Sequence, residues 1–237
     1  MRRNLPLVLL LILGIAPSLP LVAADMDDEF ADLDPWIRVN RMTHNLNDVG
    51  DRILLRPVAV GYRKMFPRFV RRGIGNAFSN LHDVSNAINN MLQGKLNHGV
   101  SDLARVLVNS TVGLAGLFDP ASSLGMVEHE EDWGQTFAKW GSPTGPYLVI
   151  PGLGPGSVRD GLSRILDSVT DPVRYLYPVS DRNVTYAARL VRNRADLLAV
   201  ESVAFGDKYI FYRGAYLQRR EYLVNDGVVS DPFADDF

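Results

Sequence analysis

ARVLVNSTVGLAGLFDPASSLGMVEHEEDWGQTFAKWGSPTGPYLVIPGLGPG, residues 104–156, is the stretch whose pattern is most informative about the fold. From Leu103 to Phe118 only Arg105 carries a charge, and a Gly/Pro/aromatic loop comes later in the stretch. A soluble surface helix needs a broad polar face, and a membrane-spanning helix needs ~20 apolar residues. The segment meets neither requirement. It therefore predicts either a deeply buried core helix or a helix that touches lipid without crossing a bilayer.

On both sides of this stretch, helical patterns alternate with Pro and Gly. Before it, we expect a helix from Asp34-Pro35 to about Leu55, with restarts at Pro57 and Pro67 and a stop at Gly94. After it, we expect two long helices over residues 182–205 and 208–224. Capping side chains mark several of the expected starts: Asp34, Ser157, Asp171, Asp181 and Asp207. The only strand-like run is Tyr147–Ile150, so the predicted fold class is all-α, in a single domain.

The first 24 residues have the pattern of a secretory signal peptide. A basic start is followed by the apolar run Leu5–Ile15, and small residues at Val22 and Ala24 precede Asp25. We expect cleavage after Ala24; the alternative is an anchor that stays attached. The remaining chain divides into an N-terminal arm (25–33), a helical domain (34–225) and a polar tail (226–237) that we expect to be mobile.

Composition excludes several classes of protein. The chain has no Cys, which removes disulfides, thiolate metal sites and the cysteine that carries a lipoprotein anchor. Loss of the signal peptide would leave 23 basic against 27 acidic residues, a net charge of −4. Nucleic acid is therefore not an expected partner, because binding phosphates requires a basic footprint. At 46% hydrophobic residues, the chain can bury a core.

The run YLVIPGLGPGSVRDG, residues 147–161, looks like a strand, a Gly-rich turn and a helix. Gly152 and Gly154 fit the start of a dinucleotide fingerprint, but Ser157 stands at the third glycine position and no βαβ pattern surrounds it. Two other interpretations stay open. One is a tight turn in which glycine supplies positive φ. In the other, the helix start at Ser157 attracts an anionic head group, with Arg159 nearby.

Patterns for catalysis and metal binding mostly fail. No serine stands in a G-x-S-x-G frame, and no two histidines have the spacing of metal ligands on a helix. His82-Asp83 could form a paired base, and the acidic run 128–132 is typical of a helix start. We therefore predict that the protein is not an enzyme and has no cofactor or metal.

The first expected helix carries Asn40, Asn45 and Asn47 around Leu46. Such a helix would suit a polar conduit next to lipid, but a solvated outer face explains it equally well. The three tryptophans Trp36, Trp133 and Trp140 have the same two-sided interpretation, as core anchors or as an interfacial belt.

The ordered set of motifs resembles the MlaA/VacJ family of outer-membrane phospholipid-removal proteins. The similarity extends from about Asp34 to Asn225. It is carried by DPWIRVNR (34–41), LLRPVAVGYRKMFP (54–67), GIGNAFSNL (73–81), NNMLQGK (89–95), LVNSTVGLAGLFDPAS (107–122), EDWGQTFAKWGSPTGPYLVIPGLGPGSVRDG (131–161) and YLQRREYL (216–223).

The resemblance implies a compact helical ring with an amphipathic central channel. The ring would lie in the periplasmic leaflet of the outer membrane of a Gram-negative bacterium. It would remove mislocalised phospholipid from the outer leaflet and pass it to a soluble periplasmic lipid-binding protein that feeds an inner-membrane ABC transporter. A trimeric outer-membrane porin would be its neighbour, and no covalent chemistry would be involved.

The resemblance also implies lipid-channel candidates. They comprise a segment of the first helix, the loop that would border the channel and one nearby cation: Asn40, Asn45, Leu46, Asn47, Gly141, Pro143, Gly145, Tyr147, Gly152, Gly154, Gly156 and Arg159. Family members commonly carry a lipidated Cys at the cleavage site, where this chain has Asp25, so we expect no lipidation. Two alternatives remain: a soluble periplasmic lipid carrier and a lipid hydrolase that uses His82-Asp83.

Overall fold

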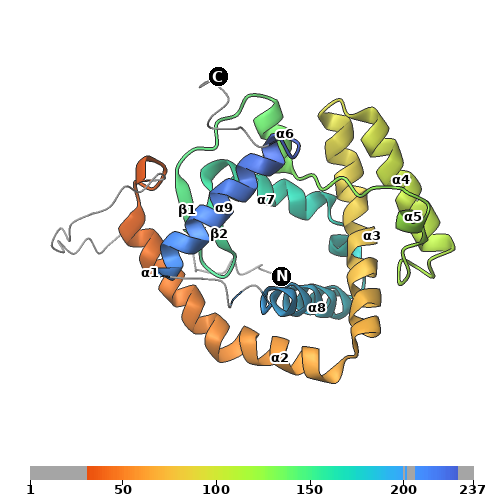
Figure 1. Ribbon diagram of the computed structural model, residues 1–237, viewed down its shortest axis with the longest axis horizontal. Helices are drawn as coiled ribbons and strands as arrows, with labels where there is room; N and C mark the ends of the chain where they lie inside the picture. The colour runs from red at the N-terminus through yellow and green to blue at the C-terminus, as the bar shows by residue number, and fades with distance from the viewer. Residues whose placement is uncertain (1–30, 200, 202–205, 229–237) are drawn as a thin grey trace, which may run out of the picture.

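The computed structural model describes residues 31–199, 201 and 206–228. The expected signal peptide, residues 25–30 of the arm and residues 229–237 lie outside this part. The described chain is mostly helical and contains one small two-stranded sheet. Its elements follow one another around a central opening in the ribbon (Figure 1). The predicted all-α, ring-like fold class is therefore confirmed.

One edge of the ring is a long, bent helical arm. After a short 3-10 turn, η1 (Ala31–Leu33), it consists of α1 (Ile37–Gly50), the π-helical turn η2 (Asp51–Leu55) and α2 (Arg56–Met65). Pro57 has no N–H to donate, and the turn before it widens so that the Arg56 N–H bonds to the Asp51 carbonyl. The predicted restart at Pro57 is thus a π-turn within a continuous arm. At Pro67 the helix does break, with Phe66 in an extended conformation.

The 25-residue helix α3 (Arg68–Leu92) borders the opening on its right side in Figure 1. Helix α4 (Leu96–Thr111) packs along it, and the short α5 (Pro120–Ser123) follows α4. Gly94 reverses the chain between α3 and α4 with φ of 82°, as expected for a glycine that ends a helix.

The remaining elements close the ring. They are α6 (Trp133–Lys139), the antiparallel hairpin of β1 (Tyr147–Ile150) and β2 (Gly154–Ser157), α7 (Val158–Thr170), η3 (Pro172–Tyr175), α8 (Val179–Leu197) and α9 (Lys208–Val224). Tyr147 pairs with Ser157 in the hairpin register. Contacts between α2 and α8, and between α6 and α9, join distant parts of the chain. None of the described helices is long and apolar enough to span a bilayer.

Three of the predicted caps are confirmed. Ser157, Asp171 and Asp207 accept hydrogen bonds from backbone N–H groups at the starts of α7, η3 and α9. The cap at Asp34 is wrong, because its carboxylate is buried and accepts instead from Asn40, Tyr209 and Arg213. The cap at Asp181 is also wrong, because α8 begins two residues earlier, after Pro178.

The start of the tail is attached to the domain. The Asp226 carboxylate forms ion pairs with Lys95 and Lys139, which lie just before α4 and at the end of α6. The expected mobility of the tail therefore does not extend to Asp226.

Candidate functional site

The fully buried positions of the described chain are mostly polar. Among the described residues, buried polar and charged side chains outnumber buried apolar ones: Asp34, Asn40, Asn80, Asp83, Ser85, Asn86, Asn89, Asn90, Asp102, Arg105, Asn109, Glu131, Gln135, Thr136, Ser157, Arg159, Asp160, Ser163 and Arg213. Large apolar side chains are exposed instead along most of the helices. This pattern differs from that of a soluble domain, whose fully buried residues are mostly apolar. The buried charges are paired, as Arg105 is with Asp83 and Arg213 with Asp34. Exposed apolar surface on this scale marks a membrane or partner interface.

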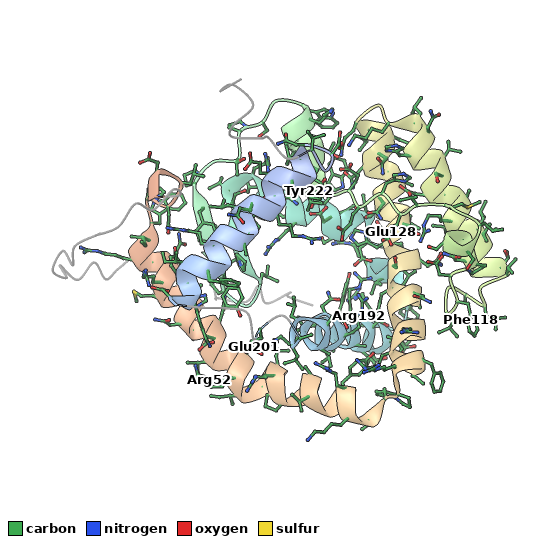
Figure 2. All side chains as sticks on the ribbon, viewed as in Figure 1. Arg52, Phe118, Glu128, Arg192, Glu201 and Tyr222 are labelled. Carbon is green, nitrogen blue, oxygen red and sulfur yellow. The ribbon has the colours of Figure 1, made fainter. Side chains whose placement is uncertain are left out.

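Helix α4 shows the reversal clearly. Its single cation, Arg105, is 2% exposed, and its Nε donates to Asp83 Oδ2 over 3.1 Å. Leu107 is 67% exposed on another side of the same helix. The loop that follows carries Phe118 to the outer edge of the molecule (Figure 2). Of the two predictions for this segment, the structure contradicts the buried core helix and agrees with a helix that presents its apolar side outward.

The arm of α1, η2 and α2 has the same organisation. Its exposed apolar side chains follow helical spacing along the outside: Val39, Met42, Leu46, Val49, Ile53, Leu54, Val58 and Met65. We call these residues, together with the exposed apolar side chains of α4 and the 112–118 loop, the apolar rim.

A cavity of about 340 Å³ lies on the inner side of the arm. We call it the α1–α9 cavity. It lies between α1, the hairpin, the end of α8 and the start of α9, and its lining is His44, Asn47, Asp48, Asp51, Tyr147, Val149, Gly154, Pro155, Arg194, Leu197, Glu201, Phe211 and Tyr212. The lining combines aromatic and aliphatic groups with the charged cluster of Asp51, Arg194 and Glu201, as a compartment for an amphipathic molecule would require.

The charged end of the cavity is a tight ion-pair cluster. Arg194 holds Asp51 with two hydrogen bonds of 2.6 and 2.8 Å and reaches Glu201 at 3.3 Å. Hydrogen bonding to Asp51 raises the pKa of Arg194, so this cation stays charged. Figure 2 shows Glu201 between the helical arm and α8. The cluster joins the π-turn of the arm to the end of α8.

His44 lies at the aromatic side of the cavity. Its ring packs edge-on against Tyr209, with ring centroids 5.6 Å apart, and lies 5.9 Å from Tyr212. Burial lowers the pKa of His44, which favours the neutral imidazole at neutral pH.

Two of the predicted channel asparagines clamp the hairpin to α1. Asn40 is fully buried; its amide donates to the Tyr147 carbonyl at 3.1 Å and its oxygen accepts from the Val149 N–H at 2.9 Å. Asn47 makes the same kind of pair with Ile150 and Gly152, at 3.0 and 2.8 Å. These amides satisfy backbone groups that would otherwise be left without a partner at the edge of β1.

The other two predicted residues of α1 lie elsewhere. Asn45 is exposed, and Leu46 belongs to the apolar rim. The structure therefore separates the predicted quartet. Asn40 and Asn47 face the hairpin, and of these only Asn47 lines the cavity.

The predicted loop residues are also divided. Tyr147 and Gly154 line the cavity. Gly141, Gly145, Gly152 and Gly154 all have positive φ, which agrees with the tight-turn interpretation. Gly156 is buried in β2, while Gly141 and Pro143 are exposed outside the cavity lining.

Arg159 is buried and already has partners within the protein. Its Nε donates to Asp160 at 2.9 Å, and the start of α7 is capped by the Ser157 hydroxyl. An anionic head group at this helix start would have to displace those contacts.

The possible His82–Asp83 base pair does not form. The ring of His82 contacts Asn86 at 2.8 Å, while Asp83 pairs with Arg105. Burial, reinforced by Glu128, raises the pKa of Asp83 to about 6. Within the described ranges, no group of three or more His, Asp or Glu side chains is placed to hold a metal ion.

Sequence reasoning missed the cavity residues His44, Asp51, Arg194, Phe211 and Tyr212. Part of the signal was present. Asn40, His44, Asn47 and Asp51 recur at intervals of four, three and four residues, the spacing of one helical face. The cavity residues of α8 and α9 show no comparable pattern in the sequence, because their position at the cavity depends on how the ring closes.

A helical ring with buried polar clusters, exposed apolar side chains and an amphipathic cavity is typical of a protein that handles lipid. Comparison with known proteins identifies the family: residues 32–223 match the family model described as MlaA lipoprotein, and the chain belongs to this family.

Relatives and a solved structure agree with that assignment. The chain is 30% identical to the intermembrane phospholipid transport system lipoprotein MlaA of Escherichia coli (strain K12), with 86% of this chain and 84% of that protein covered. It is 34% identical to an uncharacterized protein of Rickettsia conorii, covering 81% and 78%. It also superimposes with a TM-score of 0.72 and 30% identity on a solved structure described as the structural basis for maintenance of bacterial outer membrane lipid asymmetry. That match covers 81% of this chain and 99% of the other.

Proposed function

We propose that this protein transports phospholipid. It removes mislocalised phospholipids from the outer leaflet of the outer membrane and passes them toward the periplasm, which maintains lipid asymmetry. The observation that carries the proposal is the reversed burial pattern, with paired polar groups buried and large apolar side chains exposed. Membership of the MlaA lipoprotein family supports it.

The physical argument starts from the cost of moving a head group through hydrocarbon. An unpaired charge buried in an apolar medium costs several kcal/mol or more. A polar interior lowers that cost, while the apolar rim lets the ring remain in the leaflet beside the lipid tails. Helices satisfy their own backbone hydrogen bonds, so they can lie in lipid without spanning it.

The α1–α9 cavity is the proposed lipid compartment. Acyl chains would contact the side formed by Val149, Pro155 and Phe211, and the head group would face the end that holds Asp51 and Arg194. The position of the hairpin would determine access to the cavity. Asn40 and Asn47 hold the hairpin in that position on α1. Asn45, Leu46 and the exposed loop residues Gly141 and Pro143 lie outside the cavity lining and would contribute through the position of their backbone rather than through their side chains.

The finer features of the resemblance belong to the same proposal. The transport unit is residues 34–225, with residues 1–24 as an export signal. The ring lies in the periplasmic leaflet beside a trimeric porin and delivers lipid to a soluble periplasmic lipid-binding protein that feeds an inner-membrane ABC transporter. The apolar rim holds the ring in place rather than a lipid on a cysteine, since the 237 residues contain no Cys.

Fractionation of the native, untagged protein, with mass spectrometry of its N-terminus, tests the proposal. We expect a chain that begins at Asp25, without added lipid mass, in the outer-membrane fraction. Recovery in the soluble periplasm would contradict the proposal and would favour a soluble lipid carrier. A deletion strain should accumulate phospholipid in the outer leaflet and become sensitive to detergent with EDTA.

A transport role also predicts that no side chain performs hydrolysis. His82→Ala should therefore leave lipid clearance in the deletion strain unchanged, because His82 contacts Asn86 rather than a carboxylate. Loss of clearance by a variant that still accumulates in the membrane would favour the hydrolase.

A further inference from the structure

The positive charge of this chain is unevenly distributed. Residues 52–82 contain seven Lys and Arg and no Asp or Glu, although the whole chain has 25 basic against 27 acidic residues. This segment covers most of η2, α2 and the first half of α3. A block of like charge in a nearly neutral protein favours an anionic partner.

Five of these seven cations form no ion pair with a described residue: Arg71, whose Nε donates to the Phe66 carbonyl, and four that are exposed. Arg52 pairs with Asp48, and Arg56 pairs with Glu201. Arg63, Lys64, Arg68 and Arg72 are exposed around the corner where α2 meets α3, and none forms an ion pair with a described residue. We call these four residues the basic corner.

The position of the arginines in α3 opposes the stability of the helix. Arg63 and Lys64 lie in the last turn of α2, where a cation is favourable. Arg68 and Arg72 lie in the first turns of α3, at the positive end of that helix, with no acidic residue in its first turn. An external anion would offset this repulsion.

A groove of about 450 Å³ lies beside the corner, between α3 and α8. Arg68, Arg71, Arg72 and Arg192 line it together with Asn76 and Ser79. Figure 2 shows Arg192 on α8 beside α3.

The carboxylates that line the same groove already have partners. Glu128 accepts from the Ser79 hydroxyl at 2.7 Å, Asp196 pairs with Arg192 at 3.0 Å, and Asp119 accepts from Ser122 and Asn109. The exposed cations of the corner are therefore not neutralised across the groove.

Apolar side chains distinguish a membrane surface from a free anion as the partner. Met65 and Phe69 flank the cations in sequence, and each is 73% exposed. A soluble phosphate ion gains nothing from contact with exposed apolar side chains. At a bilayer surface, phosphate groups lie directly over hydrocarbon. Cations can therefore contact phosphate while the neighbouring apolar side chains contact hydrocarbon.

We propose that the basic corner binds the phosphate groups of anionic lipids at a membrane surface and so fixes the depth and tilt of this part of the ring. The inference rests on the proposed function in one respect, that the rim lies in lipid. It adds a head-group contact that lies outside the α1–α9 cavity.

The test is co-flotation of the purified full chain with vesicles after dilution of the detergent. Two compositions are compared: phosphatidylcholine alone, and phosphatidylcholine in which about one lipid in five is phosphatidylglycerol. The variant is Arg68→Gln with Arg72→Gln. The matched control, Lys139→Gln with Arg219→Gln, removes the same charge from exposed positions on α6 and α9.

We expect the wild type to bind the anionic vesicles more tightly, with a contribution of about fivefold from each arginine. The double variant should lose roughly 25-fold on anionic vesicles and nothing on neutral ones, while the control keeps the preference. High salt should weaken the preference in the wild type.

Equal preference in the variant and the wild type would overturn the inference. So would complete loss of the preference in millimolar inorganic phosphate at matched ionic strength, because that result indicates a soluble-anion site. Failure of every protein to float with neutral vesicles would count against the proposed function instead. Phe69→Asn separates the apolar contribution to binding from the electrostatic one, since it should weaken binding to both vesicle types equally.

Discussion

Two asparagines of α1 look alike in the sequence but have opposite environments. Asn40 is buried and bonded to both Tyr147 and Val149 of β1, whereas Asn45 is exposed. Asn40→Ala leaves buried backbone groups unpaired and should lower the free energy of unfolding by about 3 kcal/mol. Asn45→Ala should change it by no more than ~0.5 kcal/mol. Thermal unfolding in detergent measures both, and equal effects would contradict the clamp.

The contrast shows what the sequence reveals at this scale. Spacing alone places Asn40 and Asn47 on one face of a helix, seven residues apart. It does not say whether that face meets water, lipid or protein. The partner of Asn40 is a strand more than 100 residues away, and only the folded chain brings the two together.

Asp167 predicts an unusual dependence of stability on pH. Burial, with help from Asp132, raises the pKa of its carboxyl to about 6, although the Trp133 N–H, His82 and Arg220 oppose the shift. The folded state therefore keeps this proton when the unfolded chain has lost it. Between about pH 4 and pH 6 the contribution of Asp167 to the free energy of unfolding falls as pH rises, and it is fully lost above pH 6.

Asp167→Asn removes this contribution while it keeps an acceptor for the Trp133 N–H. We expect the variant to match the wild type near pH 4 and to become increasingly more stable than the wild type up to about pH 7. Chemical denaturation at several pH values measures the difference. A difference that stays constant with pH would contradict the assignment.

At the scale of elements, the register of α1 is the sensitive feature. Deletion of Asn45 and Leu46 rotates the following residues of the helix by about 200° around the helix axis, relative to the residues before the deletion. Asn47 and Asp51 would leave the hairpin and the cavity, and rim side chains such as Val49 would point inward. We expect altered lipid gating, seen as more phospholipid in the outer leaflet and sensitivity to detergent with EDTA.

Asn45→Ala with Leu46→Ala is the control, because it removes the same two side chains without a change of register. It should leave lipid asymmetry close to normal. If the deletion also has no effect on either readout, this segment of α1 has no role in transport.

The success of sequence reasoning for the elements has a physical limit. Ser157, Asp171 and Asp207 cap helices as predicted, since a cap depends on its own and the next three residues. Asp34 has the same local pattern, but Tyr209 and Arg213 compete for its carboxylate. The strand β2 was not predicted because its sequence, Gly-Pro-Gly-Ser, has no strand propensity. Pairing with β1 and bonding of the tip to Asn47 create it.

At the scale of the whole molecule, the reversed burial pattern could not be obtained from periodicity. The sequence pattern of the amphipathic helix α4 is the same whether its apolar side faces a core or lipid. Only the packing of α4 on α3 shows that Arg105 faces α3 and pairs with Asp83 while Leu107 is exposed. The family resemblance implies the ring, because the ordered motifs cover nearly all of its elements.

Transport through the ring predicts that a large side chain at the cavity mouth blocks lipid without unfolding the protein. Leu197, at the end of α8, lines the cavity and is 58% exposed. Leu197→Trp adds bulk there with little strain, since its side chain is not in a close-packed core. Leu190→Trp is the matched control on the same helix, exposed but outside the cavity lining. We expect Leu197→Trp to reach the membrane at normal levels and to leave phospholipid in the outer leaflet, while Leu190→Trp restores clearance in the deletion strain. Normal clearance by both variants would mean that lipid does not pass through this cavity.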